Sequence, residues 1–448
     1  MKRIVIGSAG SGSGKTCFSA GVARAAQRMG LSVRVAKSGP DYLDPLWLSQ
    51  AVGGECLNLD LWMGDEDGAR RAAASSPADL LVVEGAMGLY DGFRPDSDLG
   101  STAHLATVLD AGMAVILDAS GSARTFAAVA EGLCRFGAAR ITGIVANHVG
   151  SDGHTALLRE ALTSRGLPPL LGGIPRGAFP TLASRHLGLS YPPEQAEAIL
   201  DACADAIEKH LDLKLLLSCA GEGELESISV STREPSRRVR LGLAWDEAFR
   251  FLYPEALEMF QQEGADLVWF SPLADPELPP DLDGLWICGG YPEMHAEGLS
   301  KNRSMVRSIQ GFCASGKPVL AECGGLMYLC EEIRGVDGIW HPMCGVLPAR
   351  AIWREKGFRL GYREARLSFD CLLGSAGDRI RGHEFHYSEL EKEPPGWERV
   401  FELSGSHGPG GSEGYWNGSV LATWVHLWFP GWPRARTAWL ERMRGGKQ

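Results

Sequence analysis

A glycine-rich segment near the start of the chain has the residue types that bind nucleotide phosphates. Residues 9–16 read Ala-Gly-Ser-Gly-Ser-Gly-Lys-Thr, directly after an apolar run and directly before a helical pattern. In that context backbone N–H groups converge on phosphate oxygens at a helix N-terminus, the lysine reaches the β- and γ-phosphates, and the threonine can bind Mg²⁺. The ATP-binding residues that we expect are Gly10, Ser11, Gly12, Ser13, Gly14, Lys15 and Thr16.

Two acid-bearing segments follow later apolar runs of the same half. Residues 37–45 read KSGPDYLDP, and residues 84–92 read EGAMGLYDG. Ligands of open parallel sheets bind beyond the carboxyl ends of the strands, so acids there can hold a metal ion that bridges ATP phosphates. We expect the metal ligands to be Thr16, Asp41 and Glu84, and the substrate contacts to be Asp41, Tyr42, Leu43 and Asp91.

The second half holds a cysteine in the setting of a nucleophile. Cys323 lies in PVLAECGGLMYL, at a sharp turn between an apolar run and a helical pattern, where the helix N-terminus favours a thiolate. Far downstream, His426 in TWVHL offers an imidazole near the end of another strand, and such a pair can act as nucleophile and base in acyl transfer. We expect an oxyanion site formed by the backbone N–H groups of Gly289, Gly290 and Gly324.

The elements that must position these residues follow an alternating rhythm. Apolar runs such as RIVIGSA, SVRVAKSG, DLLVVEGA, MAVILDAS, RITGIVANHV and PLLGGIP alternate with amphipathic stretches in the first half. This rhythm predicts βαβ units and a buried parallel sheet. A helical pattern covers residues 192–216, and the polar, Gly/Ser/Glu-rich stretch that follows has no periodicity.

A second α/β rhythm begins at VRLGLAWD, continues through DLVWFSP, GLWICGG and PVLAECGG, and becomes shorter strands and turns beyond residue 339. We therefore predict an α/β protein with a phosphate-loop, parallel-sheet domain at residues 1–217, a linker at 218–237 and a second α/β domain at 238–448.

The composition excludes several classes of protein. The chain has 448 residues, a net charge of −11 with dispersed Lys and Arg, and no apolar run of the length (about 18 residues) that crosses a membrane. We expect a cytoplasmic protein without nucleic-acid or membrane partners. The 11 cysteines include no C-x-x-C pair, which is typical of reduced thiols rather than a zinc or iron–sulfur site.

An ordered set of motifs resembles the family of cobalamin-pathway a,c-diamide synthases over essentially the whole chain. The motifs are the phosphate loop, GPDYLDP, NLDLWM (58–63), EGAMGLYDG, RHLGL (185–189), AWDEAF with YPEAL, SPLADPELP, GGYPEMHAEGLSKNRSM, AECGGLMYL, GYREARL and RGHEFHYS. The resemblance implies a synthetase domain similar to dethiobiotin synthetase, joined to a glutaminase domain of the class I amidotransferase type.

The resemblance also implies roles. Cys323 would be the glutaminase nucleophile and His426 its base, and ATP with Mg²⁺ would activate a tetrapyrrole carboxylate as an acyl phosphate that ammonia converts to an amide. Class I amidotransferases commonly place a glutamate two residues after the histidine, and here that position is Trp428. After GPDYLDP the family often carries a histidine, whereas this chain has Leu46, Trp47 and Leu48.

Three other interpretations stay open at this point. The tetrapyrrole could be sirohaem or a nickel sirohydrochlorin instead of cobyrinate, since these synthases share the architecture. The first half could be a nucleotide switch of the partition-ATPase type, which GPDYLDP and AECGG argue against. The chain could also be a degenerate structural subunit, although Lys15, Thr16, Cys323 and His426 are intact. The sequence leaves monomer and homodimer open.

Overall fold

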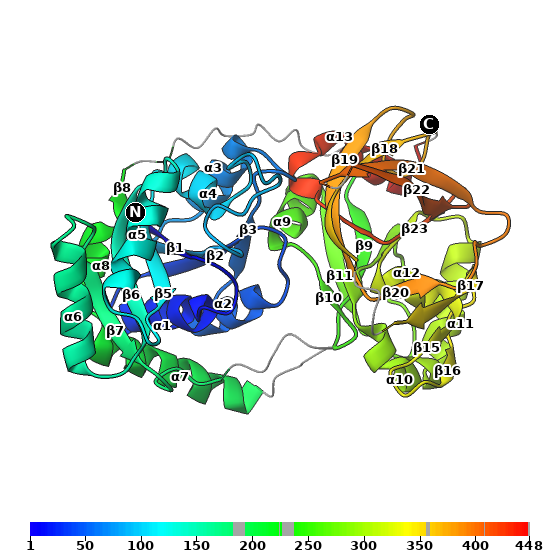
Figure 1. Cartoon of the computed structure of the whole chain (residues 1–448). Coiled ribbons are helices and arrows are strands. Elements are labelled where there is room, and N and C mark those ends of the chain that lie inside the picture. Colours follow the sequence, from blue (N-terminus) through cyan, green and yellow to red (C-terminus); the bar gives the residue numbers. More distant parts are fainter. Residues whose placement is uncertain (182–192, 224, 226–236, 355–358, 407, 447–448) are drawn as a thin grey trace. The chain divides into compact units, whose positions relative to one another are not determined.

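The computed structural model describes residues 1–181, 193–223, 225, 237–354, 359–406 and 408–446. They belong to two compact units, and Figure 1 colours the chain from blue to red along both. The first unit contains Met1–Ser184 and Tyr191–Ser229, and the second contains Arg185–Ser190 and Val230–Gln448. The RHLGL motif at 185–189 and most of the expected linker lie outside the described residues.

The first unit is built around an eight-stranded sheet with the path β3-β2-β4-β1-β5-β6-β7, in which every neighbouring pair on the path is parallel. Its strands are β1 (Lys2–Ser8), β2 (Val33–Ser38), β3 (Cys56–Leu59), β4 (Leu80–Glu84), β5 (Gly112–Asp118), β6 (Ile141–Val149), β7 (Leu170–Pro175) and β8 (Gly221–Glu222). Its helices are α1 (Lys15–Arg28), α2 (Asp44–Val52), α3 (Glu66–Ala74), α4 (Thr102–Val108), α5 (Arg124–Phe136), α6 (Asp152–Thr163), α7 (Pro193–His210) and α8 (Leu213–Cys219).

Alternation along β1 explains why both faces of this sheet are covered. Ile4 and Ile6 pack into a core with α1, α2, α7 and α8, whereas Val5 belongs to the opposite core with α3, α4, α5 and α6. Successive side chains of a strand point to opposite faces, so a strand that is apolar at every position must be buried on both. The continuous apolar runs therefore correctly predicted the parallel sheet.

The first unit continues beyond residue 217, where we expected the linker to begin. Helix α8 ends at Cys219, and the short strand β8 pairs with β1 in the antiparallel direction through Glu222 and Gly221. The Arg3 side chain also donates a hydrogen bond of 2.8 Å to the Gly223 carbonyl. The proposed boundary at 217 and the linker to 237 remain predictions.

The second unit contains a ten-stranded mixed sheet with the path β11-β9-β12-β14-β23-β22-β21-β18-β19-β24. These strands are β9 (Val239–Ala244), β11 (Ala265–Phe270), β12 (Gly284–Ile287), β14 (Val319–Glu322), β18 (Arg359–Leu367), β19 (Arg379–His386), β21 (Glu398–Gly405), β22 (Gly408–Trp416), β23 (Val420–Thr423) and β24 (Val425–Leu427). The pairs from β11 to β23 are parallel, and the remaining pairs along the path are antiparallel.

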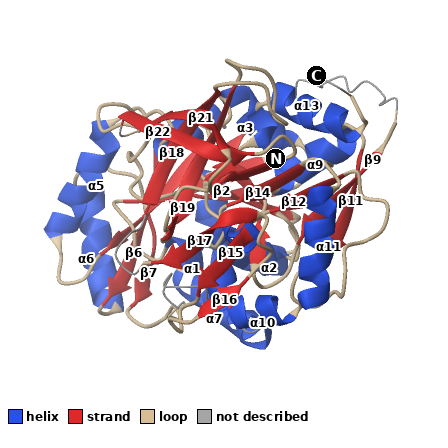
Figure 2. Cartoon of the chain, turned by 90° about the vertical axis from the view of Figure 1, so that its right-hand side faces the viewer, coloured by secondary structure: helices blue, strands red, loops and turns tan. Residues whose placement is uncertain are grey.

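Smaller sheets and helices complete the second unit (Figure 2). The other strands are β10 (Phe249–Phe251), β13 (Gly289–Gly290), β15 (Cys330–Arg334), β16 (Trp340–Pro342), β17 (Leu347–Trp353) and β20 (Ser388–Leu390). The helices are α9 (Pro254–Gln262), α10 (Ala296–Lys301), α11 (Arg303–Ala314), α12 (Gly324–Leu329), α13 (Pro433–Met443) and the short 3₁₀ helices η1 (Pro292–Met294) and η2 (Phe429–Gly431).

An aromatic cluster holds α9, η2 and α13 against β12 in the second unit. Phe260, Trp286, Phe429 and Trp439 contact one another with ring centroids 5.2–5.7 Å apart, mostly edge to face. Aromatic pairs in this arrangement add stability beyond their buried area. In the part of the chain that the structure describes, no helix is long and apolar enough to cross a membrane.

Candidate active site

The phosphate loop has the backbone that its glycines allow. Gly14 immediately precedes α1 with φ of 90°, a left-handed conformation that side chains with a Cβ avoid. The Lys15 ammonium is buried inside the loop, where it donates hydrogen bonds to the carbonyls of Gly10 (3.0 Å) and Met87 (2.8 Å) and to Ser8 Oγ (2.7 Å). The loop therefore already concentrates positive charge at the N-terminus of α1, where anions bind.

Side chains from α1, β2, α2 and β4 and from the loop before α2 meet beside this loop. The register of the parallel sheet places Lys37 on β2 directly next to Glu84 on β4. Thr16 Oγ1 donates to Glu84 Oε1 at 2.8 Å, and Lys37 Nζ donates to the same oxygen at 2.9 Å and to Asp44 Oδ2 at 2.6 Å. Asp41 Oδ2 lies 3.9 Å from Lys37 Nζ. The structure thus brings Thr16, Glu84 and Asp41 into one cluster around Lys37.

Burial sets the charges of this cluster. Burial raises the pKa of Glu84 to about 7, Lys37 acts in the opposite direction, and the nearby Asp44 carboxylate raises the pKa further. For Lys37 burial alone would lower the pKa, but Glu84, Asp44 and Asp41 outweigh it and hold the pKa above its ordinary value. Lys37 therefore stays protonated, and Glu84 can gain or lose a proton near neutral pH.

The residues present fit a magnesium ion that is held mainly by phosphates and water. Glu84 Oε2 is buried and has no hydrogen-bond partner among the described residues, and its other oxygen contacts the Thr16 hydroxyl. Among the described residues, no group of three His, Cys, Asp or Glu side chains is arranged to hold a metal by itself. Mg²⁺ in nucleotide sites commonly takes only one or two protein oxygens, so Thr16 and Glu84 suffice.

Hydrogen bonds within the GPDYLDP loop and from Asn58 hold this loop in place. Asp41 Oδ1 accepts hydrogen bonds from the backbone N–H groups of Leu43 (2.9 Å) and Asp44 (3.2 Å), which starts α2, and Asn58 Nδ2 donates to the Asp41 carbonyl at 2.8 Å. Tyr42 and Leu43 are half-buried in this loop. Asp41 therefore shapes the loop in addition to facing Lys37.

Asp91, a predicted substrate contact, lies in the EGAMGLYDG loop. It is exposed, and its Oδ2 accepts a hydrogen bond of 2.8 Å from the Gly88 N–H. A Cβ at position 88 would lie 2.7 Å from the same oxygen, so a larger residue there would displace the Asp91 carboxylate. Asp91 fixes the turn of the loop, and a role in substrate binding stays a prediction.

Cys323 lies at a strained turn in the second unit. It has φ of 46° and ψ of −99°, and it directly precedes α12. A non-glycine residue at positive φ is strained, and such strain at a nucleophile indicates function. Its N–H donates to the Thr423 carbonyl at 2.6 Å, and a Cβ at Gly325 would lie 2.0 Å from the Ile287 carbonyl oxygen. The small residues after Cys323 therefore permit the turn, as the sequence predicted.

His426 lies beside His383, because the antiparallel register of β19 and β24 pairs these positions. Their rings stack with centroids 5.0 Å apart and an angle of 23°. The backbone carbonyl of Phe385 lies 3.8 Å from Cys323 Sγ, and the same carbonyl favours the protonated form of His426. Cys323 and His426 therefore both lie close to the same backbone carbonyl group.

Both reactive groups are fully buried, and burial favours the neutral form of each. Burial raises the pKa of Cys323 well above its usual range, Glu293 raises it further, and the Gly324 N–H acts in the opposite direction. Burial lowers the pKa of His426 well below its usual value, with His383 adding to the effect. At neutral pH the pair is thus a thiol and a neutral imidazole, which suits proton transfer to His426 during attack.

The three predicted oxyanion glycines lie against these groups. A Cβ at Gly289 would lie 2.2 Å from His426 Cε1, and a Cβ at Gly324 would lie 2.9 Å from the Gly290 nitrogen. Strand β13, which consists of Gly289 and Gly290, pairs with β10. The structure therefore brings all three glycines together with Cys323 and His426.

Trp428 does not take the place of an orienting carboxylate. Its ring packs edge to face on Tyr253 with centroids 4.6 Å apart, and the Tyr253 hydroxyl contacts His383 Nδ1 at 3.1 Å.

Glu322, which directly precedes Cys323, accepts hydrogen bonds from the Leu427 N–H (2.9 Å) and from Trp286 Nε1 (3.0 Å). Glu322 therefore ties the strand of the nucleophile to the strand of the base.

Sequence reasoning missed Lys37, Glu293, Glu322 and His383 as members of these sites. Each belongs to a motif that was noticed: Lys37 opens KSGPDYLDP, Glu293 ends GGYPE, Glu322 precedes Cys323 and His383 lies in RGHEFHYS. A lysine or glutamate at the end of an apolar run is a usable signal, because burial demands a partner for it.

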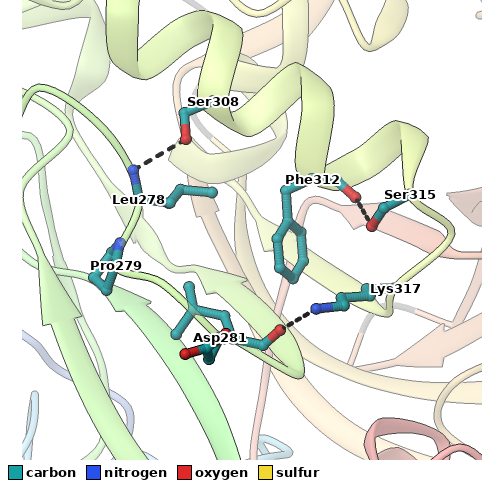
Figure 3. Close-up of a pocket in the computed structure, with 8 residues that line it drawn as sticks. Leu278, Pro279, Asp281, Ser308, Phe312, Ser315 and Lys317 are labelled. Carbon is teal, nitrogen blue, oxygen red and sulfur yellow. Dashed lines mark hydrogen bonds between the residues drawn. The ribbon is translucent and has the colours of Figure 1, made fainter.

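A shallow pocket of about 270 Å³ lies elsewhere in the second unit (Figure 3). The loop with Leu278 and Asp281 and the helix residue Phe312 line it, and Lys317 Nζ donates to the Leu282 carbonyl at 2.6 Å. Lys317 precedes β14, whereas Cys323 follows it. The pocket is therefore at the opposite end of the strand from the nucleophile.

Two family models match the chain, one in each unit. Residues 4–189 match the CobQ/CobB/MinD/ParA nucleotide binding domain, and residues 240–432 match the CobB/CobQ-like glutamine amidotransferase domain. The first match covers the phosphate loop and Glu84, and the second covers Cys323 and His426. A nucleotide-binding part and an amidotransferase part therefore occur in one chain.

Curated relatives match nearly the full length. A cobyrinate a,c-diamide synthase of Syntrophotalea carbinolica is 42% identical over 99% of this chain and 99% of its own. One of Leptospira interrogans is 40% identical over 95% of both chains. A hydrogenobyrinate a,c-diamide synthase of Mesorhizobium japonicum is 38% identical over 95% of this chain and 98% of its own. The match extends across both units.

Proposed function

The chain belongs to the family of cobyrinate and hydrogenobyrinate a,c-diamide synthases, and from this premise we propose that it amidates the a- and c-side-chain carboxylates of cobyrinate, using ATP and glutamine. The observation that carries the proposal is the pairing of a strained, buried Cys323 with His426 in a chain that also has a phosphate loop. A thiol–imidazole pair beside glycine N–H groups suits release of ammonia from an amide, and a phosphate loop suits activation of a carboxylate.

In the second unit we assign the glutaminase reaction to Cys323 and His426. His426 accepts the thiol proton while Sγ attacks the side-chain carboxamide of glutamine, and the backbone N–H groups of Gly289, Gly290 and Gly324 stabilise the oxyanion. His426 then gives the proton to the leaving ammonia. Water hydrolyses the thioester and releases glutamate, which restores the thiol.

In the first unit we assign ATP binding to residues 10–16 and carboxylate activation to the cluster around Lys37. Lys15 and Lys37 offset the charge of the phosphates and of the substrate carboxylate. Thr16, Asp41 and Glu84 would hold Mg²⁺, which neutralises phosphate charge when bound. The γ-phosphoryl group passes to the carboxylate to form an acyl phosphate, and ammonia displaces phosphate to give the amide. Asp41, Tyr42, Leu43 and Asp91 are our proposed substrate contacts.

The alternative functions differ in what they require. A partition-ATPase switch needs no thiol nucleophile, and a degenerate subunit needs neither Lys15 nor Cys323 in place. Sirohaem and nickel sirohydrochlorin remain alternative substrates with the same chemistry. A cytoplasmic location and the absence of nucleic-acid and membrane partners stay predictions from the composition.

The experiment that tests the substrate is a comparison of tetrapyrroles. Purified protein is incubated with ATP, Mg²⁺, glutamine and one tetrapyrrole per reaction: cobyrinate, hydrogenobyrinate, sirohaem or nickel sirohydrochlorin. The carboxyl groups that have been converted to amides are counted by mass spectrometry. We expect a diamide from cobyrinate. A diamide formed only from sirohaem or nickel sirohydrochlorin would replace the proposed substrate, and no amide from any of them would contradict the reaction.

A further inference from the structure

Glu293 is a buried carboxylate that the proposed glutaminase mechanism does not use. It lies in η1, directly after the glycine turn of β13, and only 5% of the residue is exposed. Its carboxylate accepts from its own backbone N–H, and Oε2 has no hydrogen-bond partner in the part of the chain that the structure describes. A buried carboxylate oxygen without a partner is costly, so a position of this kind indicates a group that arrives from outside.

The turn that carries Glu293 packs on the residue after the nucleophile. A Cβ at Gly324 would lie 2.9 Å from Pro292 Cδ and 2.9 Å from the Gly290 nitrogen. Glu293 is also close to Cys323: among the side-chain charges, that of Glu293 raises the pKa of the Cys323 thiol the most. Glu293 therefore faces the region in which the substrate of Cys323 must bind.

Other carboxylates near Cys323 already have partners. Glu322 accepts two hydrogen bonds from N–H groups, and Glu384 Oε2 accepts one of 2.7 Å from Arg363 Nε. Among the described carboxylates that raise the pKa of Cys323, Glu293 is thus the one with an oxygen that has no hydrogen-bond partner.

We propose that Glu293 binds the α-ammonium group of glutamine and thereby selects an α-amino acid amide as the substrate of Cys323. This inference rests on the proposed glutaminase activity. Glutamine carries a cation at the end opposite to its reactive carboxamide, and a buried carboxylate binds such a cation through charge-assisted hydrogen bonds. When the ammonium group neutralises Glu293, the repulsion between Glu293 and a developing Cys323 thiolate also falls, so binding of the correct substrate favours attack.

The test compares glutamine with 4-carbamoylbutanoate, which has the same carboxamide but lacks the α-amino group. Hydrolysis of both is measured with the full chain as wild type, Glu293→Gln and Glu293→Asp. We expect Glu293→Gln to lower kcat/KM for glutamine by about 30-fold or more, since a charge-assisted bond in a buried site is lost, and to leave 4-carbamoylbutanoate nearly unchanged. Glu293→Asp keeps the charge and should keep a preference for glutamine.

The matched control is Glu297→Gln, one turn further along the chain. Glu297 is an exposed carboxylate that pairs with Lys301 on α10, so this variant should leave both kcat/KM values unchanged. Synthesis driven by added ammonium salt reports whether the first unit of each variant is intact. An equal loss for both amides in Glu293→Gln, or a loss of the glutamine preference in Glu293→Asp, would overturn the inference. A wild-type chain that hydrolyses neither amide but works with ammonium would contradict the glutaminase itself, and the inference with it.

Discussion

Burial determines the charge state of the reactive side chains in each unit. Glu84, Cys323 and His426 are all removed from water, and each has a pKa shifted toward its neutral form. Desolvation disfavours a charge unless a partner compensates, and only Glu84 has a cation, Lys37, in hydrogen-bond contact. We therefore expect the carboxylate cluster to respond to cations and the thiol to become reactive only when its substrate is bound.

Glu84→Gln tests the metal site. The substitution keeps the size of the side chain and removes an anionic ligand, so ammonia-driven synthesis should fall by about 100-fold and the Mg²⁺ requirement should rise. In the wild type the pKa of Glu84 is raised to about 7, so its carboxylate forms, and Mg²⁺ affinity improves, as the pH rises through 7. The measurement is a Mg²⁺ titration of synthesis from ammonium salt at pH 6 and pH 8.

Asp41→Asn is the comparison variant for this titration. Asp41 Oδ1 accepts two backbone hydrogen bonds, and Oδ2 lies 3.9 Å from Lys37 Nζ. If Asp41 positions substrate, Asp41→Asn should mainly raise the concentration of ATP or tetrapyrrole that synthesis requires. If Asp41 binds the metal, the variant should also require more Mg²⁺. A Glu84→Gln protein with the wild-type rate and the wild-type Mg²⁺ dependence would remove Glu84 from the metal site.

At the scale of elements, the glycine turn of β13 and the strand ends of β14 and β24 hold the thiol site together. Gly289 leaves room for the His426 ring, and Glu322 bridges β14 to β24. These contacts join segments that are about a hundred residues apart in sequence, such as Glu322 and Leu427 with a separation of 105. The site is therefore sensitive to changes that leave its reactive side chains intact.

Gly289→Ala tests the close approach of this turn to the base. The new Cβ would lie 2.2 Å from His426 Cε1, so the imidazole or the turn must move, and a shift of about 1 Å can cost about 100-fold in rate. We expect glutaminase activity to fall by that factor while ammonia-driven synthesis continues. The control is Gly311→Ala on α11, where a Cβ meets no atom within 4 Å. Normal glutamine hydrolysis by Gly289→Ala would show that the turn does not confine His426.

Glu322 gives the second unit a specific pH dependence of stability. Burial raises the pKa of Glu322 to about 8, whereas in the unfolded chain a glutamate titrates near about 4.3. Between pH 6.5 and 8 the unfolded state has lost this proton and the folded state still binds it. Stability therefore falls as the pH rises, by about 1.4 kcal/mol per pH unit while the carboxyl is protonated.

The measurement is thermal or urea unfolding at several pH values across this window. Glu322→Gln should flatten the slope by about one proton. Glu293 and Glu413, two other buried carboxyls of the second unit, have a pKa of about 7 and contribute mainly at the lower end of this pH window. His383 and His426 have lowered pKa values in the folded protein, so they make stability rise with pH only below about 6.5, where histidines of the unfolded chain are protonated. Their contribution therefore ends below the pH window of Glu322. An unchanged slope in Glu322→Gln would contradict the assignment.

How much of the structure the sequence predicts depends on how far apart in the chain the interacting residues lie. The glycine-rich turn between β1 and α1, the parallel sheet and the turn at Cys323 depend on neighbouring residues, and the sequence predicted all three conformations correctly. The contacts between Lys37 and Glu84 and between His383 and His426 depend on strand register, which joins distant segments and has no local signature. Lys37 and His383 were therefore seen as parts of motifs but not as members of a site.

At the scale of the whole molecule, each unit matches one half of the proposed reaction. The first unit matches a nucleotide binding domain and the second a glutamine amidotransferase domain, and the family match extends across both. The net charge of −11 means that anionic substrates depend on local cations, and Lys15 and Lys37 are the buried lysines that meet this need in the described part of the first unit. A single defect should therefore remove one half-reaction and spare the other.

The most direct test of this assignment follows the amide nitrogen. Cobyrinate, ATP and Mg²⁺ are supplied with glutamine labelled with ¹⁵N in its side-chain amide, and the products of the wild type and of Cys323→Ala are analysed by mass spectrometry. We predict that the wild type forms a doubly labelled diamide, and that Cys323→Ala forms none from glutamine but forms the labelled diamide from ¹⁵N-ammonium salt. Label transfer from glutamine by Cys323→Ala at a rate near that of the wild type would contradict the account.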